Sequence, residues 1–191
     1  MIEEEMLIEI AKLTGKEKEI KKITEFGLCG VINWEDGLRR RIEILEGIEY
    51  KDILRVSEKY TLKKGVKEAV KMFKKNNFAT AVITGGFDLQ AKLVCKELGI
   101  DYLACNKLLF RSGKLFDVQV NVSVKDSWIH FFSDFCEAKI TMAFGDGAND
   151  IPMVEAVNIG KILLPTDNIF EVSKHFFHPA QPFKSPLLRY F

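Results

Sequence analysis

The chain has 191 residues, of which 47% are hydrophobic and 29% are charged. This balance supports a buried core and excludes a disordered chain, and the length suits one domain with an insertion or two small domains. The net charge is only +1, so no global field attracts nucleic acid or an anionic membrane. No apolar run approaches the roughly 18 residues that a membrane helix needs, and the acidic start differs from a secretory signal, so we expect a cytoplasmic protein.

The first 60 residues predict helices separated by turn signals. Apolar residues recur at helical spacing in four stretches, which are 7–14, 16–26, 34–45 and 52–60. Gly15 and Gly47 suit the ends of the first and third of these helices. We expect residues 1–60 to form a small helical cap.

From residue 61 onward, strands alternate with helices. The first expected element is a helix with Val66, Val70 and Phe73 along one face. The elements expected after it are a strand at 78–83, a helix at 88–98, a hairpin of 101–110 and 115–124, a helix at 127–135, a strand at 140–144, a helix with Pro152 in its first turn, a strand at 162–164 and a helix at 169–176. This order predicts an α/β fold, a Rossmann-like, mostly parallel sheet with helices on both faces, over residues 61–191. The strands at 78–83 and 140–144 are apolar and should be buried on both faces. The tail 178–191 is proline-rich and predicted to be irregular.

Cysteines and histidines do not form a metal-binding pattern in this sequence. The four cysteines show no CxxC spacing and the three histidines show no HExxH pattern, which argues against zinc. Cys95 and Cys105 lie in apolar stretches and are interpreted as small buried residues. The residues concerned are Cys29, Cys95, Cys105, Cys136, His130, His175 and His178. The histidines are expected to be structural or on the surface.

The segment Phe144-Gly145-Asp146-Gly147-Ala148-Asn149-Asp150 is the most informative part of the chain. It places two carboxylates and an amide in a turn at the end of a predicted strand. Mg²⁺ prefers such hard oxygen ligands, with one or two carboxylates completed by waters and phosphate oxygens. The alternative is an ordinary Asx turn in which the last aspartate caps the next helix.

A second candidate site follows the strand at 78–83, where the sequence reads Thr84-Gly85-Gly86 before a predicted helix. We expect a tight turn here. Helix N-termini bind phosphate through free N–H groups, and the threonine adds a hydroxyl donor. The alternative is an ordinary connection between a strand and a helix.

Lys125 stands immediately before another predicted helix. A lysine at such a place can neutralise the charge of a phosphoryl group. Taken alone, it is one of 28 basic residues and reads more simply as a solvated side chain.

The order of these three features resembles that of the haloacid dehalogenase phosphatases. A strand ending in TGG, a single lysine and then GDGxND after a later strand is their motif order, and VITGGFD, GKL and FGDGANDIPM are similar to the phosphoserine phosphatase group in particular. The helical stretches LIEIAKLTGKEKEIKKIT and LRRRIEIL also match. The resemblance covers roughly residues 2–160, and it fades where Leu163–Asp167 replaces the family's Ala-Lys-Pro segment.

The resemblance implies a role for each matching residue. Asp146 would bind Mg²⁺ with support from Asp150, while Lys125 would balance charge on the nucleophile and the phosphate. Thr84 and Gly85 would hold the phosphoryl group. The residues implied for the rest of the substrate are Asn149, which would position it, Glu5, which would meet its ammonium, and Arg41, which would grip its carboxylate. The alternatives are an acidic helix start for Glu5 and a solvated arginine cluster for Arg41.

The family's catalytic DxDxT motif occurs nowhere in the 191 residues. Its first aspartate is the nucleophile and its second the general acid. The resemblance places that motif just before Ile2, on a strand between those at 78–83 and 140–144. We therefore expect a Mg²⁺-dependent phosphatase of a small phosphorylated metabolite, most simply L-phosphoserine, that is N-terminally truncated and inactive as this chain. The alternative is an inactive paralogue that binds a phosphorylated ligand or a protein partner.

Overall fold

The computed structural model describes residues 1–2, 5–28, 31–164, 167–174 and 176. The packing divides the chain into two compact units. The first unit contains Met1–Leu62 and Thr80–Ser123, and the second contains Lys63–Ala79 and Val124–Phe191. The expectations for Cys29, His175, His178 and the tail 178–191 lie outside the described residues.

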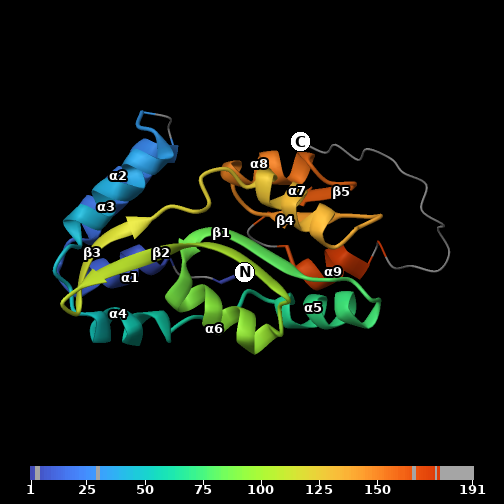
Figure 1. Ribbon diagram of the computed structural model, residues 1–191, viewed down its shortest axis with the longest axis horizontal. Coiled ribbons are helices and arrows are strands. Elements are labelled where there is room, and N and C mark those ends of the chain that lie inside the picture. Colours follow the sequence, from blue (N-terminus) through green and yellow to red (C-terminus); the bar gives the residue numbers. More distant parts are fainter. Residues whose placement is uncertain (3–4, 29–30, 165–166, 175, 177–191) are drawn as a thin grey trace. The chain divides into compact units, whose positions relative to one another are not determined.

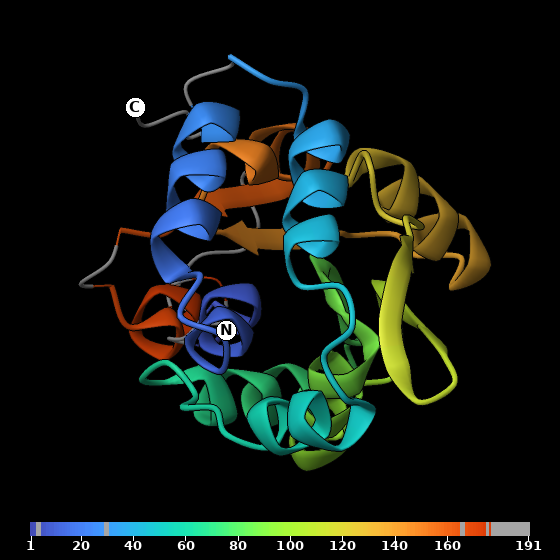
Figure 2. The same cartoon turned by 90° about the vertical axis from the view of Figure 1, so that its left-hand side faces the viewer.

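Four helices begin the first unit, as the apolar periodicity predicts. They are α1 (Met6–Lys12), α2 (Glu17–Leu28), α3 (Trp34–Ile44) and α4 (Tyr50–Ser57). Asn33 caps α3 by accepting the N–H of Glu35 at 2.8 Å, which satisfies a backbone donor that the helix itself leaves free. The helices α2 and α3 lie side by side (Figure 1 and Figure 2). Their apolar faces bury Ile20, Leu38 and Ile42.

A three-stranded sheet completes the first unit. β1 (Ala81–Phe87) pairs in parallel with β2 (Tyr102–Arg111), and β2 pairs antiparallel with β3 (Lys114–Gln119). The helix α6 (Asp88–Leu98) connects β1 to β2. Positive φ angles at Ser112 and Gly113 form the predicted hairpin turn. Side chains from this sheet and from the helices α1–α4 share one hydrophobic core.

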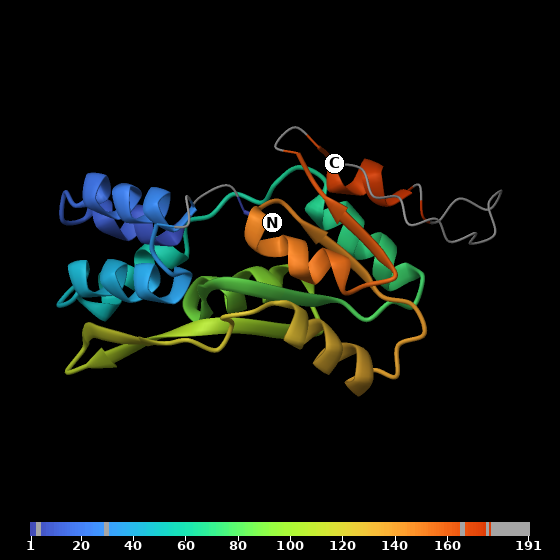
Figure 3. The same cartoon turned by 90° about the horizontal axis from the view of Figure 1, so that it is seen from above.

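The second unit is built around two short parallel strands, β4 (Met142–Gly145) and β5 (Ile159–Ile162). Its helices are α5 (Val66–Lys75), α7 (Asp126–Phe135), α8 (Ile151–Glu155) and α9 (Ile169–Lys174), and a 3₁₀ turn spans Ala148–Asp150. The helices α5 and α9 lie side by side (Figure 3). Phe144 of β4 contacts Phe73 of α5, with ring centroids 5.8 Å apart.

The structure confirms the α/β class but corrects three details of the expectation. The described strands form two small sheets, one mixed and one parallel, and β1 and β4 belong to different sheets. Thr84-Gly85-Gly86 is not a tight turn, because β1 continues to Phe87 and pairs there with Asn106 after an irregularity. Most residues of β1 and β4 are only half-buried, so neither strand is covered on both faces.

Packing units need not coincide with domains, so the division at residue 60 stays a prediction. None of the described helices is long and apolar enough to cross a membrane.

Candidate active site

The loop that follows β4 is organised by the carboxylate of Asp150. Asp150 is 5% exposed and its Oδ2 accepts the N–H groups of Asp146 at 3.0 Å and Gly147 at 3.1 Å. Its Oδ1 accepts a hydrogen bond from Nζ of Lys125. Asp150 makes no side-chain cap to α8. Both of its oxygens are therefore used to hold the loop and the lysine in place.

Two glycines allow the loop to approach Asp150 this closely. A Cβ on Gly145 would lie 2.2 Å from the Cβ of Asp150, and one on Gly147 would lie 2.7 Å from Oδ1 of Asn149. The first contact is with the rigid start of a side chain, so no rotation of that side chain relieves it. The glycine at 145 is thus a requirement of the loop, and Asn149 is exposed at its rim.

Lys125 is not a solvated lysine. Its side chain is only 12% exposed, and it stands at the start of α7 with its ammonium on Asp150. A buried ammonium needs a partner because removal of a charge from water is costly. Asp150 supplies that partner, so Lys125 presents a fixed positive charge beside the loop.

Asp146 is the accessible carboxylate of the loop, with a side chain that is 49% exposed. Its Oδ2 lies 2.6 Å from Nζ of Lys63, and this hydrogen bond lowers the pKa of Asp146 below its ordinary value. Burial opposes the shift, and the charges of Lys63 and Lys125 add to it. The carboxylate is therefore ionised at neutral pH.

An ionised, half-exposed carboxylate fits Mg²⁺, which uses one or two carboxylates and keeps several waters. Asp146 is the direct donor that the loop offers, while Asp150 is committed to hydrogen bonds. Across the residues that the structure describes, no group of three or more His, Cys, Asp or Glu could hold a metal ion. The donor set therefore suits a magnesium ion completed by water and phosphate oxygens, and does not suit a closed protein cage.

In the first unit, the end of β1 is fixed by a buried asparagine. Asn106 of β2 is fully buried and its Nδ2 donates to the carbonyl of Gly85 at 2.9 Å. Its Oδ1 accepts the N–H groups of Asn121 and Val122, each at 2.9 Å. The Thr84 hydroxyl accepts the N–H of Gly86 at 3.0 Å. Hydrogen bonds therefore hold the Gly85 carbonyl and the Thr84 hydroxyl at this strand end.

Trp34, the first residue of α3, covers this strand end. A Cβ on Gly85 would lie 2.9 Å from Cζ2 of Trp34. The absence of a side chain at Gly85 thus makes room for the indole.

Glu5 and Arg41 form an ion pair within the first unit. Nη1 of Arg41 lies 3.0 Å from Oε1 of Glu5 and 3.2 Å from Oγ1 of Thr24. The Arg41 side chain is 11% exposed, whereas its neighbour Arg40 is exposed. Burial lowers the pKa of Arg41, and the charge of Glu5 opposes this. Arg41 therefore differs from a solvated arginine, and one cation and one anion stand side by side.

The structure divides the predicted residues between the two units. Lys125, Asp146, Asn149 and Asp150 lie on one loop and the helix beside it in the second unit, and Glu5, Arg41, Thr84 and Gly85 belong to the first unit. Sequence reasoning missed Lys63, Asn106 and Trp34. No local pattern marks Lys63 or Asn106, whereas Trp34 lies between the two helical stretches that resemble the family.

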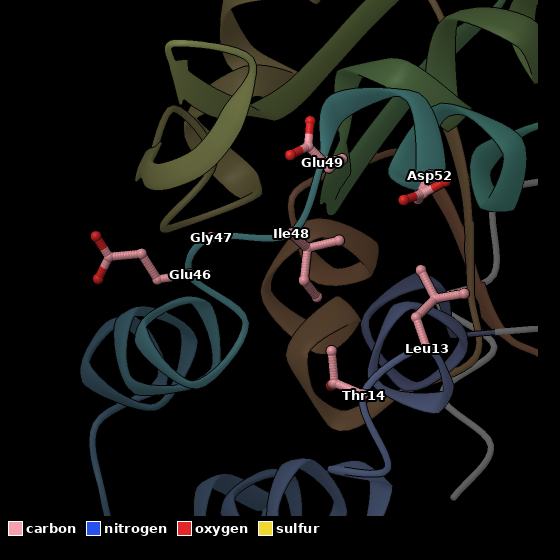
Figure 4. A pocket seen from close by; sticks show the side chains of 7 residues that line it. All are labelled: Leu13, Thr14, Glu46, Gly47, Ile48, Glu49 and Asp52. Carbon is pink, nitrogen blue, oxygen red and sulfur yellow. The ribbon is translucent and has the colours of Figure 1, made fainter.

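A separate cavity of about 370 Å³ lies in the first unit (Figure 4). It is lined by Leu13, Thr14, Glu46, Gly47, Ile48, Glu49 and Asp52. None of the predicted site residues lines it. Two of its carboxylates have basic neighbours, because Glu49 lies 3.8 Å from Lys114 and Asp52 lies 3.2 Å from Arg55.

Comparison with known proteins identifies the protein class to which this chain belongs. The family model for haloacid dehalogenase-like hydrolases matches residues 3–158. The chain therefore belongs to the haloacid dehalogenase-like hydrolase family.

The relatives of this chain include many phosphoserine phosphatases. The chain is 32% identical over 167 residues to the phosphoserine phosphatase of Methanocaldococcus jannaschii, covering 83% of this chain and 78% of that protein. The enzyme of Streptococcus thermophilus is 30% identical, with 84% and 77% covered. The chain spans 48% of the longer phosphoserine phosphatase of Archaeoglobus fulgidus.

Solved structures of phosphoserine phosphatases are also similar to this chain. A substrate-bound phosphoserine phosphatase complex matches with a TM-score of 0.83 and 28% identity, covering 91% of this chain and 92% of the other. A phospho-aspartyl intermediate analogue of phosphoserine phosphatase matches with a TM-score of 0.79 and 30% identity, with 90% and 85% covered.

Proposed function

We propose that this chain carries the substrate- and metal-binding residues of a Mg²⁺-dependent phosphomonoester hydrolase whose substrate is L-phosphoserine. The observation that carries the proposal is the loop after β4, where Asp150 joins the buried Lys125 to the N–H groups around Asp146. Such a loop offers one ionised carboxylate and one fixed ammonium, which together suit a cation and a phosphoryl group. Similarity to phosphoserine phosphatases supports the choice of substrate.

Each of the predicted site residues has its own proposed role in binding the metal or the substrate. Asp146 would hold Mg²⁺, which supplies charge neutralisation to the phosphoryl oxygens. Lys125 would add a second positive charge beside it. Thr84 and the N–H of Gly85 would hold the phosphoryl group, and Asn149 would orient the substrate.

Arg41 and Glu5 would recognise the amino-acid end of the substrate. A guanidinium binds a carboxylate through two parallel hydrogen bonds, and a carboxylate binds an ammonium. The Arg41–Glu5 pair places a positive and a negative charge next to one another, which complements the carboxylate and the ammonium of an amino acid. An amino acid would therefore replace the internal pair by two charge-assisted contacts.

The hydrolysis itself needs two further carboxylates. One attacks phosphorus and displaces the seryl oxygen, which the other protonates, and water then hydrolyses the aspartyl-phosphate. The motif that supplies them in the family is absent from the 191 residues. We therefore propose that these residues alone bind ligand and Mg²⁺ without turnover, and that activity requires a segment with DxDxT.

The test compares the 191-residue chain with a version extended at its N-terminus by about 15 family-like residues ending in DxDST. We expect both to bind Mg²⁺ in calorimetry, and only the extended version to release phosphate from L-phosphoserine. Asp146→Asn should abolish Mg²⁺ binding by both. Ligand binding without phosphate release in the extended version would instead favour an inactive binding protein. Mg²⁺ binding that Asp146→Asn leaves unchanged would remove the metal assignment.

A further inference from the structure

The second unit places an additional lysine on the carboxylate that we assign to the metal. Nζ of Lys63 lies 2.6 Å from Oδ2 of Asp146, although 83 positions separate them in the sequence. Lys63 stands before α5, whose Phe73 contacts Phe144 of β4. Since Asp146 follows β4 directly, the packing of α5 on β4 brings Lys63 to the loop. The contact is therefore a product of the fold and not of local sequence.

Two kinds of cation compete for such an oxygen. The lysine ammonium is a compact point charge that donates hydrogen bonds to carboxylates. Mg²⁺ coordinates carboxylate oxygens directly and demands a nearly regular shell of six oxygens. Two cations on one carboxylate also repel each other. Pairing with Lys63 and binding of Mg²⁺ thus oppose each other at Asp146.

The roles of the two lysines beside the loop differ. Lys125 is buried on Asp150, whose two oxygens both accept hydrogen bonds, so a cation at Asp146 need not displace it. The side chain of Lys63 is 34% exposed and that of Asp146 is 49% exposed. Solvent access makes this second ion pair the exchangeable one.

We propose that Lys63 is a built-in competitor of the divalent cation, which must displace the lysine from Asp146 to bind. This inference rests on the proposed function, because it takes Asp146 as the magnesium ligand. Linkage makes the effect reciprocal. Lys63 weakens the binding of Mg²⁺, and Mg²⁺ releases the Lys63 ammonium.

The first test is titration calorimetry of the full chain with MgCl₂. Exposed ion pairs are weak, so Lys63→Met should tighten Mg²⁺ binding only on the order of fivefold. Lys63→Arg keeps a cation at this place and should retain weak binding. Lys64→Met is the matched control, because it removes the same charge from the exposed neighbouring residue. It should leave the Kd for Mg²⁺ near that of the parent, and circular dichroism melts of all variants verify folding.

The second test detects directly whether Mg²⁺ releases the ammonium of Lys63 from Asp146. Limited acetylation followed by mass spectrometry should show faster modification of Lys63 as MgCl₂ is added, with no change at Lys64. In Asp146→Asn, MgCl₂ should change neither rate.

The outcomes separate this inference from the proposed function. If the parent binds Mg²⁺ through Asp146 but Lys63→Met binds it no more tightly than Lys64→Met, the inference is wrong and the proposed function stands. Unchanged acetylation of Lys63 at saturating MgCl₂ would also overturn it. If neither the parent nor Lys63→Met binds Mg²⁺ through Asp146, the metal assignment fails and the inference fails with it.

Discussion

Lys125 and Asp150 form an ion pair in which both side chains are nearly buried, with exposed fractions of 12% and 7%. The other oxygen of Asp150 accepts two backbone N–H groups of the same loop. Such a pair adds little net stability relative to apolar residues, but loss of one partner leaves an uncompensated buried charge. The pair therefore fixes the geometry of the loop, and its members should be strongly coupled.

This coupling predicts the effect of Asp150→Asn on stability. The amide can still accept the loop N–H groups, but it leaves the buried ammonium of Lys125 without its ion-pair partner, at a cost of about 3 kcal/mol. Lys125→Met should cost a similar amount, and the double variant should cost clearly less than the sum. Urea denaturation measures all three. Asp134→Asn, at an exposed position on α7, should stay within about 0.5 kcal/mol. Equal effects of Asp150→Asn and Asp134→Asn would contradict the prediction.

The close packing around Gly145 predicts that a larger residue at this position destabilises the same loop. A methyl group at this position would lie 2.2 Å from Cβ of Asp150 and 2.7 Å from its Cγ. Gly145→Ala must therefore push the loop or Asp150 away, and we expect a loss of about 2 kcal/mol or more in the free energy of unfolding. Urea denaturation measures this loss.

Gly27→Ala is the matched control for this substitution. A Cβ at Gly27, within α2, meets nothing within 4 Å, so the better helix propensity of alanine should stabilise by about 0.5–1 kcal/mol. A neutral Gly145→Ala would show that the loop is not closely packed on Asp150.

The sequence predicts the helices and the site loop because their signals are local. Helical spacing locates α1–α4, and the GDGAND segment places Asp146 and Asp150 on one turn. The pairing of Lys63 with Asp146 has no local signal, since Lys63 is one lysine in a lysine-rich stretch. Long-range contacts of this kind depend on how α5 packs on β4, which periodicity alone does not encode.

The strand β1 shows how tertiary contacts override a turn signal. Two adjacent glycines after Thr84 favour a tight turn locally. In the structure Asn106, fully buried, donates to the carbonyl of Gly85 where the register of the ladder is irregular. The strand consequently continues to Phe87, and only the partner strand reveals why.

Cys95 predicts a dependence of stability on alkaline pH. Burial first, and the neighbouring Cys105 second, raise the pKa of its thiol from 9.0 to about 11. The folded state therefore favours the neutral thiol. The contribution of this pKa shift to the free energy of unfolding is fully present below the ordinary pKa of a thiol and is lost as the pH rises towards 11. The total loss is on the order of 2–3 kcal/mol. Urea denaturation at pH 8 and at pH 11 should show a smaller alkaline loss for Cys95→Val than for the parent.

Labelling checks the same pKa shift independently. At pH 8 a disulfide reagent should react with Cys95 only after denaturation, because a buried neutral thiol is a poor nucleophile. Rapid labelling of Cys95 in the folded protein, or equal alkaline losses in the parent and Cys95→Val, would contradict the assignment.

Arg41 predicts how the extended, DxDST-bearing protein chooses its substrate. Its guanidinium is mostly buried and is held by Glu5 and Thr24, so it is oriented before a ligand arrives. Arg41→Ala should lower kcat/KM for L-phosphoserine about ten- to a hundredfold, because a charge-assisted contact to the substrate carboxylate is worth roughly 1.5–3 kcal/mol. Phenyl phosphate has no carboxylate and should be affected much less. Arg40→Ala, at the exposed neighbouring position, should leave both substrates near the parental rates. Equal losses on both substrates would mean that Arg41 supports the fold of the first unit and does not recognise the amino-acid end. A parental melting temperature for Arg41→Ala, together with a selective loss of phosphoserine turnover, would establish the recognition role.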